Sequence, residues 1–147
     1  DSTENNANGI LTRANPNLSN NLQIVLTNRL QGTASTVGAT TADVITLALG
    51  STPGTYTFDI KIAGFASAAS GGPLSVGYTI VGAVRTTGAA AVLISGQARD
   101  DFEEGALSAC GFAIVASGNN AVFRSTGAAG TTIAWSAVGE YVFATEP

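Results

Sequence analysis

The strongest constraint in this sequence is a hydrophobic period of two. In the run Tyr56–Ile62, aromatic or branched side chains occupy every second position, and Asp59 and Lys61 lie between them. An α-helix would repeat its apolar residues at intervals of three and four, whereas a β-strand with one buried face alternates in this way. We therefore predict a strand here, with Asp59 and Lys61 forming a weak, solvated pair on its outer face.

Similar alternation recurs along the chain at spacings of roughly 8 to 15 residues. A second long strand is predicted at residues 74–84, and shorter strands are predicted at 22–27, 44–49, 92–98, 110–116, 122–125 and 133–143. About eight strands at such spacings are typical of a β-sandwich or barrel. The predicted fold class is all-β: an antiparallel β-sandwich, jelly-roll-like in its connections.

Turn-forming residues separate these runs. Glycine and asparagine tolerate positive φ, and proline presets φ for a turn. The predicted turns are Thr52–Gly54, Ser70–Pro73, Thr87–Gly88, Ser117–Asn120 and Gly127–Gly130. The clearest tight hairpin is Ser117–Asn120, which joins the runs on either side of it.

The length of 147 residues suits one hydrophobic core. Only 11% of the residues are charged, and Ala, Gly, Thr and Ser make up half of the chain, so both interior and surface are built from small side chains. Residues 1–21 contain seven asparagines, whose side chains compete with regular ladders for hydrogen bonds. We predict an extended arm or linker over 1–21 and one sandwich domain over 22–147.

Several functions are excluded by what the sequence lacks. With no histidine, the chain cannot build a Ser-His-Asp triad or a histidine-based zinc site. The one cysteine, Cys110, lies in an apolar run and is predicted to be a small buried thiol. The six basic residues are scattered and the net charge is −4, which argues against nucleic-acid binding. No apolar run approaches the roughly 18 residues of a membrane-spanning helix. We expect no catalytic residues, no cofactor and no metal.

The only charge cluster is Asp100–Glu104, with four carboxylates in five positions. We interpret it as a solvated acidic loop. Two alternatives stay open: carboxylate oxygens that bind calcium, and a carboxylate pair that hydrolyses glycosides through Asp101 or Glu103. The run lacks the ordered Asp, Asn and Gly positions of a helix-loop-helix calcium site.

Aromatic side chains raise the question of sugar binding, because exposed rings stack on the flat faces of pyranoses. Tyr56, Tyr78 and Trp135 share a phase with the buried rows, so we predict that they pack in the core. Tyr141, near the end of the chain, remains open.

Several strands carry apolar residues on the face opposite the main hydrophobic rows. These are Val81, Ala83, Leu93, Ala113, Val115, Ala134 and Val138. An apolar surface of this kind on a subunit usually marks an interface, so we predict a homo-oligomer.

The block Ser117–Gly127, followed by Thr131–Ala137, resembles the last hairpin and closing strand of bacteriophage tail-fibre and appendage tip domains, and the resemblance extends loosely from Leu22 to Phe143. Those domains are trimeric jelly rolls similar to the globular heads of the tumour necrosis factor and complement families. The resemblance implies a homotrimeric virion component that binds a host surface, with residues 1–21 leading toward a shaft.

The leading hypothesis is thus a non-enzymatic structural protein of the virion surface that acts in host attachment. Its expected partners are two further copies, other virion proteins through the arm, and a host glycan or protein; the receptor-binding residues are unknown. Candidate tip loops are 66–73, 86–90 and 100–108. Alternatives are a capsid or head-decoration protein and a secreted carbohydrate-binding module.

Overall fold

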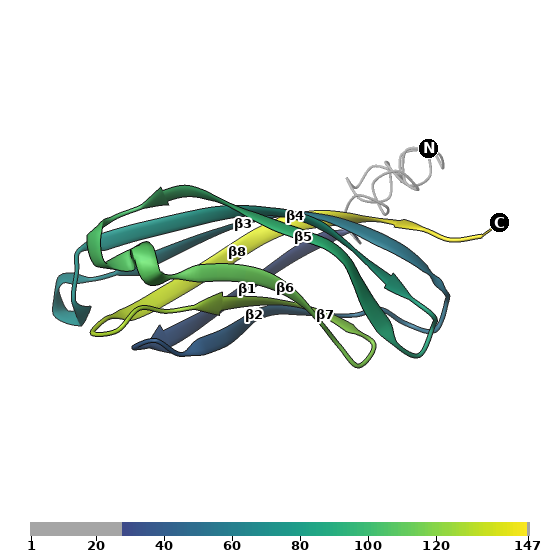
Figure 1. The fold of residues 1–147 in the computed structure, drawn as a ribbon, viewed down its shortest axis with the longest axis horizontal. Coiled ribbons are helices and arrows are strands. Elements are labelled where there is room, and N and C mark those ends of the chain that lie inside the picture. The colour runs from purple at the N-terminus through teal and green to yellow at the C-terminus, as the bar shows by residue number, and fades with distance from the viewer. Residues whose placement is uncertain (1–27, 147) are drawn as a thin grey trace, which may run out of the picture.

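The computed structural model describes residues 28–146, which form eight β-strands and two short 3₁₀ turns (Figure 1). The strands are β1 (Arg29–Val37), β2 (Thr41–Ala48), β3 (Gly54–Ala66), β4 (Leu74–Thr86), β5 (Ala91–Glu103), β6 (Gly111–Ser117), β7 (Asn120–Thr126) and β8 (Thr132–Ala144). The 3₁₀ turns are η2 (Ala68–Ser70) and η3 (Gly105–Ala109). The segments 1–21 and 22–27, predicted as an arm and a strand, lie outside the described residues.

The strands form two antiparallel sheets that face one another (Figure 1). The larger sheet has five strands in the order β1-β8-β3-β4-β5, and the smaller has three in the order β2-β7-β6. Hairpins connect β3 to β4 to β5 within the larger sheet and β6 to β7 within the smaller one. The predicted all-β sandwich is confirmed, while its jelly-roll connectivity stays a prediction.

The core lies between the sheets and is made from the alternating rows that the sequence shows. Tyr56, Phe58, Ile60 and Ile62 of β3 are all buried, as is Trp135 of β8. Phe58 meets Phe123 of the smaller sheet edge to face, with ring centroids 5.0 Å apart. A contact of this geometry adds about 1 kcal/mol to the burial of the two rings. The two sheets are thus held together by interlocking side chains rather than by backbone pairing.

The predicted turns occur where glycine, asparagine and proline place them. Ser117 pairs with Asn120 across a tight hairpin in which Gly118 has a φ of 59°. Asn119 in this turn accepts a backbone hydrogen bond from Leu49, and its side chain donates to the carbonyl of Gly50 at 2.7 Å. The hairpin therefore also fixes the start of the loop between β2 and β3.

Strand β1 was not predicted, because Leu30 and Val37 are its only large apolar residues. Gly32, the fourth of its nine residues, accounts for part of this weak apolar pattern. A side chain at Gly32 would collide with the backbone carbonyl of Val44 in β2. The two sheets therefore approach closely at Gly32, where no side chain fits between β1 and β2.

The loops gather at the two ends of the sandwich. One end carries residues 38–40, 67–73, 104–110 and 127–131, tied together by a hydrogen bond from Gly38 to Thr131 and by the approach of Gly71 to Gly130. The other end carries 49–53, 87–90 and 118–119. The proposed tip loops therefore do not share one end: 67–73 lies opposite 87–90. The prediction of a loop at 100–103 was wrong, because these residues belong to β5.

The described chain begins and ends toward the same end of the sandwich. Asn28 accepts a backbone hydrogen bond from Tyr141 near the end of β8, and the chain continues from there to Glu146 (Figure 1). The loops 67–73 and 104–110 lie at the opposite end.

Trp135 provides a test of the core. A Cβ at Gly64 would lie 2.6 Å from the Trp135 ring, whereas a Cβ at Gly111 would meet nothing within 4 Å. We expect Gly64→Ala to lower the free energy of unfolding by about 1–3 kcal/mol, since the added methyl overpacks a filled core. Gly111→Ala is the matched control and should change stability little. Urea denaturation followed by tryptophan fluorescence measures both, and equal stabilities would contradict the packing described.

Candidate interaction surface on the five-stranded sheet

Exposed large apolar side chains are confined to one of the two sheets. In the part of the chain that the structure describes, they are Val37, Phe65, Val81, Val92, Leu93, Ile94, Phe102, Val138 and Val142. All of these belong to β1, β3, β4, β5 or β8, the strands of the five-stranded sheet. The three-stranded sheet instead exposes residues such as Asp43, Thr46 and Ala113. The two outer faces of the sandwich are therefore chemically different.

Strand β5 is the most exposed element of the sheet. Eleven of its thirteen residues are exposed, although it pairs with β4 along its whole length. Two register shifts interrupt that pairing, so that Ile94 and Asp101 have no direct partner on β4. A β-bulge twists a strand and changes the direction of its side chains. The three successive apolar residues Val92, Leu93 and Ile94 consequently remain exposed to solvent.

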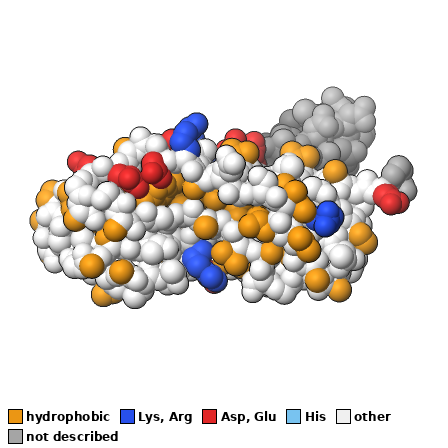
Figure 2. All heavy atoms as spheres, viewed as in Figure 1, with side chains coloured by type: hydrophobic (Ala, Val, Ile, Leu, Met, Phe, Trp, Pro, Cys, Tyr) orange, Lys and Arg blue, Asp and Glu red, His pale blue; other side chains and the backbone are white. Residues whose placement is uncertain are grey.

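The flank of the sandwich formed by β5 and β6 exposes apolar side chains (Figure 2). Figure 2 looks onto this flank and shows apolar side chains along its middle, between β5 above and β6 below. Leu93 lies here, beside Gly96 and close to Ile114 of β6. It pairs with Val84, whose side chain is buried, so the prediction that Leu93 lies opposite the hydrophobic rows was wrong.

The other predicted residues of the second face divide between the two sheets. Val81, Ala83, Ala134 and Val138 belong to the five-stranded sheet, whereas Ala113 and Val115 belong to β6 of the smaller one. They therefore do not form one continuous patch. Val81 and Val138 are the large exposed members, at 57% and 41%.

An apolar hollow occupies the outer face of the larger sheet near the end with loops 67–73 and 104–110. It has a volume of about 550 Å³, and the half-exposed rings of Phe65 and Phe102 line it together with Ala63 and Ala134. The Phe102 ring lies across Gly77, where a Cβ would be 2.5 Å from a ring carbon. A glycine at this position is what allows the ring to lie against the sheet.

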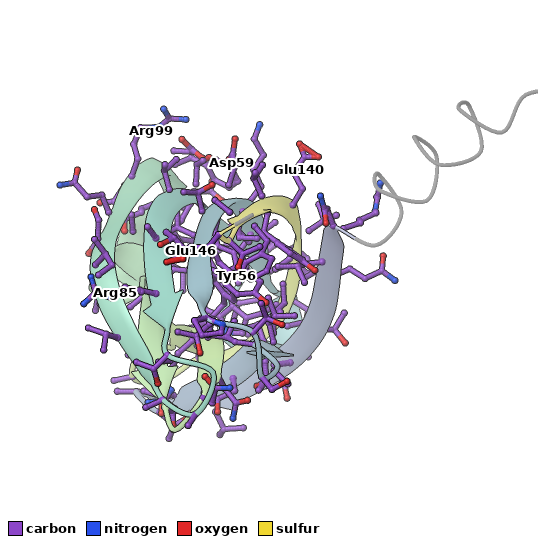
Figure 3. All side chains as sticks on the ribbon, turned by 90° about the vertical axis from the view of Figure 1, so that its right-hand side faces the viewer. Tyr56, Asp59, Arg85, Arg99, Glu140 and Glu146 are labelled. Carbon is purple, nitrogen blue, oxygen red and sulfur yellow. The ribbon has the colours of Figure 1, made fainter. Side chains whose placement is uncertain are left out.

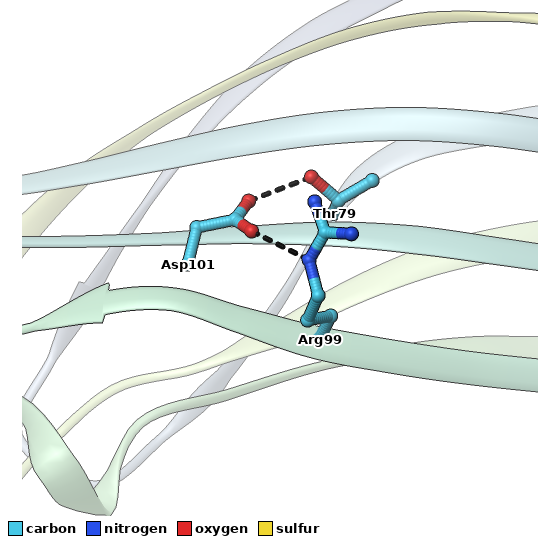
Figure 4. A network of polar contacts seen from close by, with 3 residues as sticks. All are labelled: Thr79, Arg99 and Asp101. Carbon is cyan, nitrogen blue, oxygen red and sulfur yellow. Dashed lines mark hydrogen bonds and ion pairs between the residues drawn. The ribbon is translucent and has the colours of Figure 1, made fainter.

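From the hollow toward the middle of β5, Thr79, Arg99 and Asp101 form a polar network (Figure 4). The Thr79 hydroxyl donates to Asp101 Oδ2 at 2.6 Å, and Arg99 Nε donates to Asp101 Oδ1 at 2.8 Å. Hydrogen bonds from Thr79 and Arg99 lower the pKa of Asp101. Asp101 lies at the bulge and pairs with no residue of β4. Its carboxylate can therefore bind Arg99 on the outer face of the sheet.

Beyond the network, charged residues of both signs form a row across the sheet. Asp59, Glu140 and Arg29 are neighbours on β3, β8 and β1. Lys61 lies two residues further along β3, on the same face. With Val138 and Gly139 these residues line a shallow hollow of about 330 Å³. Figure 3, which looks along the strands, shows Arg99, Asp59 and Glu140 projecting from the same side of the sheet. Between residues 28 and 146, the predicted Asp59–Lys61 contact is not among the ion pairs within 4.0 Å.

Most carboxylates of the acidic run Asp100–Glu104 accept hydrogen bonds from the same chain, so the run does not form the predicted solvated loop. Tyr78 donates its hydroxyl to Glu103 at 2.9 Å, and the backbone amide of Ser75 donates to Glu104 at 2.7 Å. Burial and the bond to Glu103 raise the pKa of Tyr78. Among residues 28–146, no group of three His, Cys, Asp or Glu side chains is placed to hold a metal ion.

The predicted core aromatics are confirmed: Trp135, Tyr78 and Tyr56 are 1%, 1% and 8% exposed. Tyr141 is half-buried and packs against Tyr56 at 5.3 Å between ring centroids. Cys110 is half-buried against the core, and burial raises the pKa of its thiol. Trp135 and Tyr78 are also among the residues that line the outer hollows, whereas Tyr56, Tyr141 and Cys110 line neither of these two hollows.

Sequence reasoning missed Phe65 and Phe102. Phe65 could have been found, because continuing the alternation of β3 past Ile62 places it on the face of Asp59 and Lys61. Phe102 could not, because the bulge at Asp101 shifts the phase of β5 immediately before it.

No protein-family model matches the chain, and no curated protein matches it. Among solved structures, the tailspike protein of Acinetobacter phage vB_ApiP_P1 aligns with 79% of this chain at 14% identity and a TM-score of 0.30. The tailspike of Acinetobacter baumannii phage AM24 aligns with 77% at 11% identity and a TM-score of 0.31. The chain spans 22% and 26% of these tailspikes, and no residue role is transferred from them.

No helix within residues 28–146 has the length and apolar character needed to cross a membrane.

Asp101 gives a pH-dependent test of the polar network. Because its folded pKa is lowered, its contribution to stability is fully present above the unfolded pKa near 3.8 and is lost as the pH falls through the folded value. We expect Asp101→Asn to unfold at lower urea concentration than the wild type at pH 7, and this difference to shrink below about pH 4. Urea titrations between pH 2 and pH 7 measure it, and a difference independent of pH would contradict the network.

Proposed function

We propose that the chain is a non-enzymatic structural domain of a phage tail appendage, which assembles as a homotrimer and acts in host attachment. One observation carries the proposal: all the exposed large apolar side chains of the described residues belong to the five-stranded sheet, and all except Leu93 and Ile94 have the phase of its outer face. A soluble subunit that concentrates such residues on one surface usually covers that surface in its assembled state. Identical copies provide the simplest cover.

The opposite outer face suits contact with water. On the three-stranded sheet, Arg124 Nε donates to Asp43 at 2.6 Å, and both side chains are partly exposed. Thr46 and Ala113 are also exposed there. A trimer that turns its five-stranded sheets inward and its three-stranded sheets outward therefore matches the chemistry of each face.

The placement of the ends supports an appendage. With both described ends toward one end of the sandwich, residues 1–21 would act as the arm that mounts the domain on other virion proteins. The loops 67–73 and 104–110 would then point away from the mount, toward a host glycan or protein. Variation in loops on a fixed scaffold suits recognition. The sequence resemblance of Ser117–Gly127 to appendage tip domains supports the same role, on the outside of the virion.

The domain would act without a cofactor, since attachment needs binding and mechanical persistence rather than chemistry. A closed β-structure with buried contacts between subunits unfolds slowly, which suits a particle outside the cell. A capsid or head-decoration protein would use the same trimeric surface. Adsorption separates the two: the purified trimer should compete with phage for host cells if it attaches, and should not if it only decorates.

A carbohydrate-binding module is the second candidate, and the apolar hollow favours it. Phe65 and Phe102 are 52% and 49% exposed on either side of a hollow of about 550 Å³. Exposed rings can stack on sugars. This function requires a monomer in solution and glycan binding that Phe102→Ala abolishes.

Val142 tests the trimer. It is 63% exposed on the outer face of β8, and Thr46 is exposed on the three-stranded sheet. We expect wild-type protein to sediment as a trimer and Val142→Lys as a monomer with unchanged circular dichroism, because a lysine charge would be desolvated in the interface. Thr46→Lys is the control and should remain trimeric. A monomeric wild type would remove the support for the appendage.

A further inference from the structure

The described ladder between β1 and β8 ends before β8 does. Its last pair is Arg29 with Glu140, whereas β8 continues to Ala144. On the other side of β8, strand β3 accompanies it to that end, where Thr55 pairs with Ala144. Among residues 28–146, no strand lies beside 142–144 on the β1 side. This side of residues 142–144 is therefore a notch in the sheet, one strand wide.

The backbone at the notch is directed for further pairing. Tyr141 donates its amide to the carbonyl of Asn28 at 3.0 Å, one step beyond the last pair of the ladder. In a strand, the N–H and C=O of one residue point to the same side, and the side alternates from residue to residue. The backbone groups of Phe143 therefore point toward the notch, as those of Tyr141 point toward Asn28, whereas those of Val142 point toward β3.

The inner face beside the notch carries aromatic rings that are only partly covered. Tyr141 and Phe143 are half-buried and pack against the buried Tyr56, with ring centroids 5.3 Å and 4.3 Å from that of Tyr56. Tyr56 in turn donates its hydroxyl to the carbonyl of Leu49 at 2.7 Å, which fixes the rings to the loop after β2. Apolar side chains placed next to Phe143 would extend the core over these rings.

The sequence directly before Asn28 has the pattern that the notch requires. Residues 22–27 alternate between two sets, Leu22, Ile24 and Leu26 on one side and Gln23, Val25 and Thr27 on the other. Leu30 of β1 is buried, so every second residue before it would share the inner face if the strand continued. The apolar set has that phase. A shift of one residue would instead turn Gln23 and Thr27 toward the core.

We propose that residues 22–27 continue β1 and fill the notch, antiparallel to the end of β8, with Leu26 opposite Phe143 and Ile24 opposite Thr145. This register continues the pairing of Arg29 with Glu140 without a shift. Leu26 and Ile24 then cover the half-buried rings on the inner face. The occupant is the segment of the same chain, because residues joined directly to Asn28 need no loop to reach the notch.

The consequence is a fixed origin for the arm of residues 1–21. With 22–27 paired, the arm leaves the sandwich beside the end of β8, about 20 Å further along the sheet than Asn28. The arm is then mounted on a strand of the sheet rather than on a linker, so the sheet sets the direction of the domain relative to whatever the arm binds. The inference goes beyond the proposed function and does not depend on how many copies assemble.

Disulfide formation tests the register. The test variant carries Val25→Cys and Ala144→Cys in a Cys110→Ser background. In the proposed register these two residues form a non-hydrogen-bonded pair on the outer face, with Cα atoms about 4.5 Å apart, a distance that a disulfide spans. The matched control pairs Val25→Cys with Glu140→Cys. Glu140 is exposed on the same face of β8, and a loose segment tethered at Asn28 would reach it as readily as Ala144.

We expect the intrachain disulfide of the test variant to be favoured over that of the control by about tenfold or more in a glutathione redox buffer, because only the first pair is held at bonding distance. Thiols counted with a maleimide label after denaturation measure both. Equal disulfide formation in the two variants, or none in the test variant, overturns the pairing. Disulfides between chains, seen on a gel without reductant, would give the notch to residues 22–27 of a second copy and overturn the assignment to the same chain.

Amide exchange followed by NMR tests the pairing without cysteines. Leu26→Ser should raise the exchange rate of the Phe143 amide by about tenfold or more, because it removes the inner side chain opposite that amide. Val25→Ser is the control on the outer face and should change this rate less than about twofold. The Val142 amide, on the β3 side where Val142 pairs with Thr57, is the reference in each sample.

Two results of the exchange experiment overturn the inference. One is a Phe143 amide that exchanges in the wild type as fast as in an unstructured peptide. The other is a rate that Leu26→Ser and Val25→Ser raise equally. Either result leaves the proposed function unchanged, since that function rests on the oligomeric state and on adsorption to host cells.

Discussion

The two sheets of this sandwich differ in width, and the arrangement of the surface depends on that difference. A five-stranded sheet is two strands, or about 10 Å, wider than the three-stranded sheet that covers it. Along β1 the excess is absorbed, because Gly32 lets the sheet close directly onto β2. Along β5, Ile114 of β6 comes close to Gly96, yet eleven of the thirteen residues of the strand stay exposed. The exposure of β5 thus follows from the unequal widths of the two sheets as well as from its sequence.

The apolar and charged groups on the larger sheet contribute differently to association. Burying a large apolar side chain is worth about 1.5–3 kcal/mol, so a half-exposed one still has about 1 kcal/mol to gain. Association costs about 4–15 kcal/mol in lost freedom, and several such side chains must therefore be covered together. An exposed ion pair adds about 0.2–1 kcal/mol. In any association through this sheet, apolar side chains such as Val142 and Phe102 would supply most of the affinity, and exposed ion pairs would add little.

Sequence reasoning succeeded where one face of a strand is buried under large side chains. Strands β3 and β8 alternate between buried and more exposed residues because only one face of each lies on the core, and the turn at Gly118 uses a positive φ that glycine tolerates. It failed where packing demands small residues or where a bulge shifts the phase. Strand β1 has almost no large apolar residues because its backbone contacts β2, and β5 changes phase at Ile94 and Asp101. In β2, a register shift buries both Val44 and Ile45, which gives the run two apolar faces.

The interaction surface was harder to predict because it arises from register rather than from local pattern. Asp100–Glu104 has the composition of a loop, yet β4 supplies Thr79, Tyr78 and Ser75 to bind its carboxylates, and the run continues the sheet. Nothing local indicates that pairing, since the partners lie more than twenty residues away.

The network around Asp101 also orders the Arg99 side chain within the single chain. A free arginine loses about 2 kcal/mol of rotamer freedom when it is fixed in one geometry, which can cancel the gain from an exposed ion pair. Here Asp101 holds the guanidinium through Nε, and Thr79 holds Asp101, so part of that loss is incurred on folding. The remaining guanidinium nitrogens keep their donors for a second carboxylate. A side chain ordered in the isolated subunit, with donors still directed outward, can form a new ion pair at lower entropic cost than a mobile one. The bulge that removes Asp101 from the β4 ladder is therefore the local feature that orders Arg99 on the outer face of the sheet.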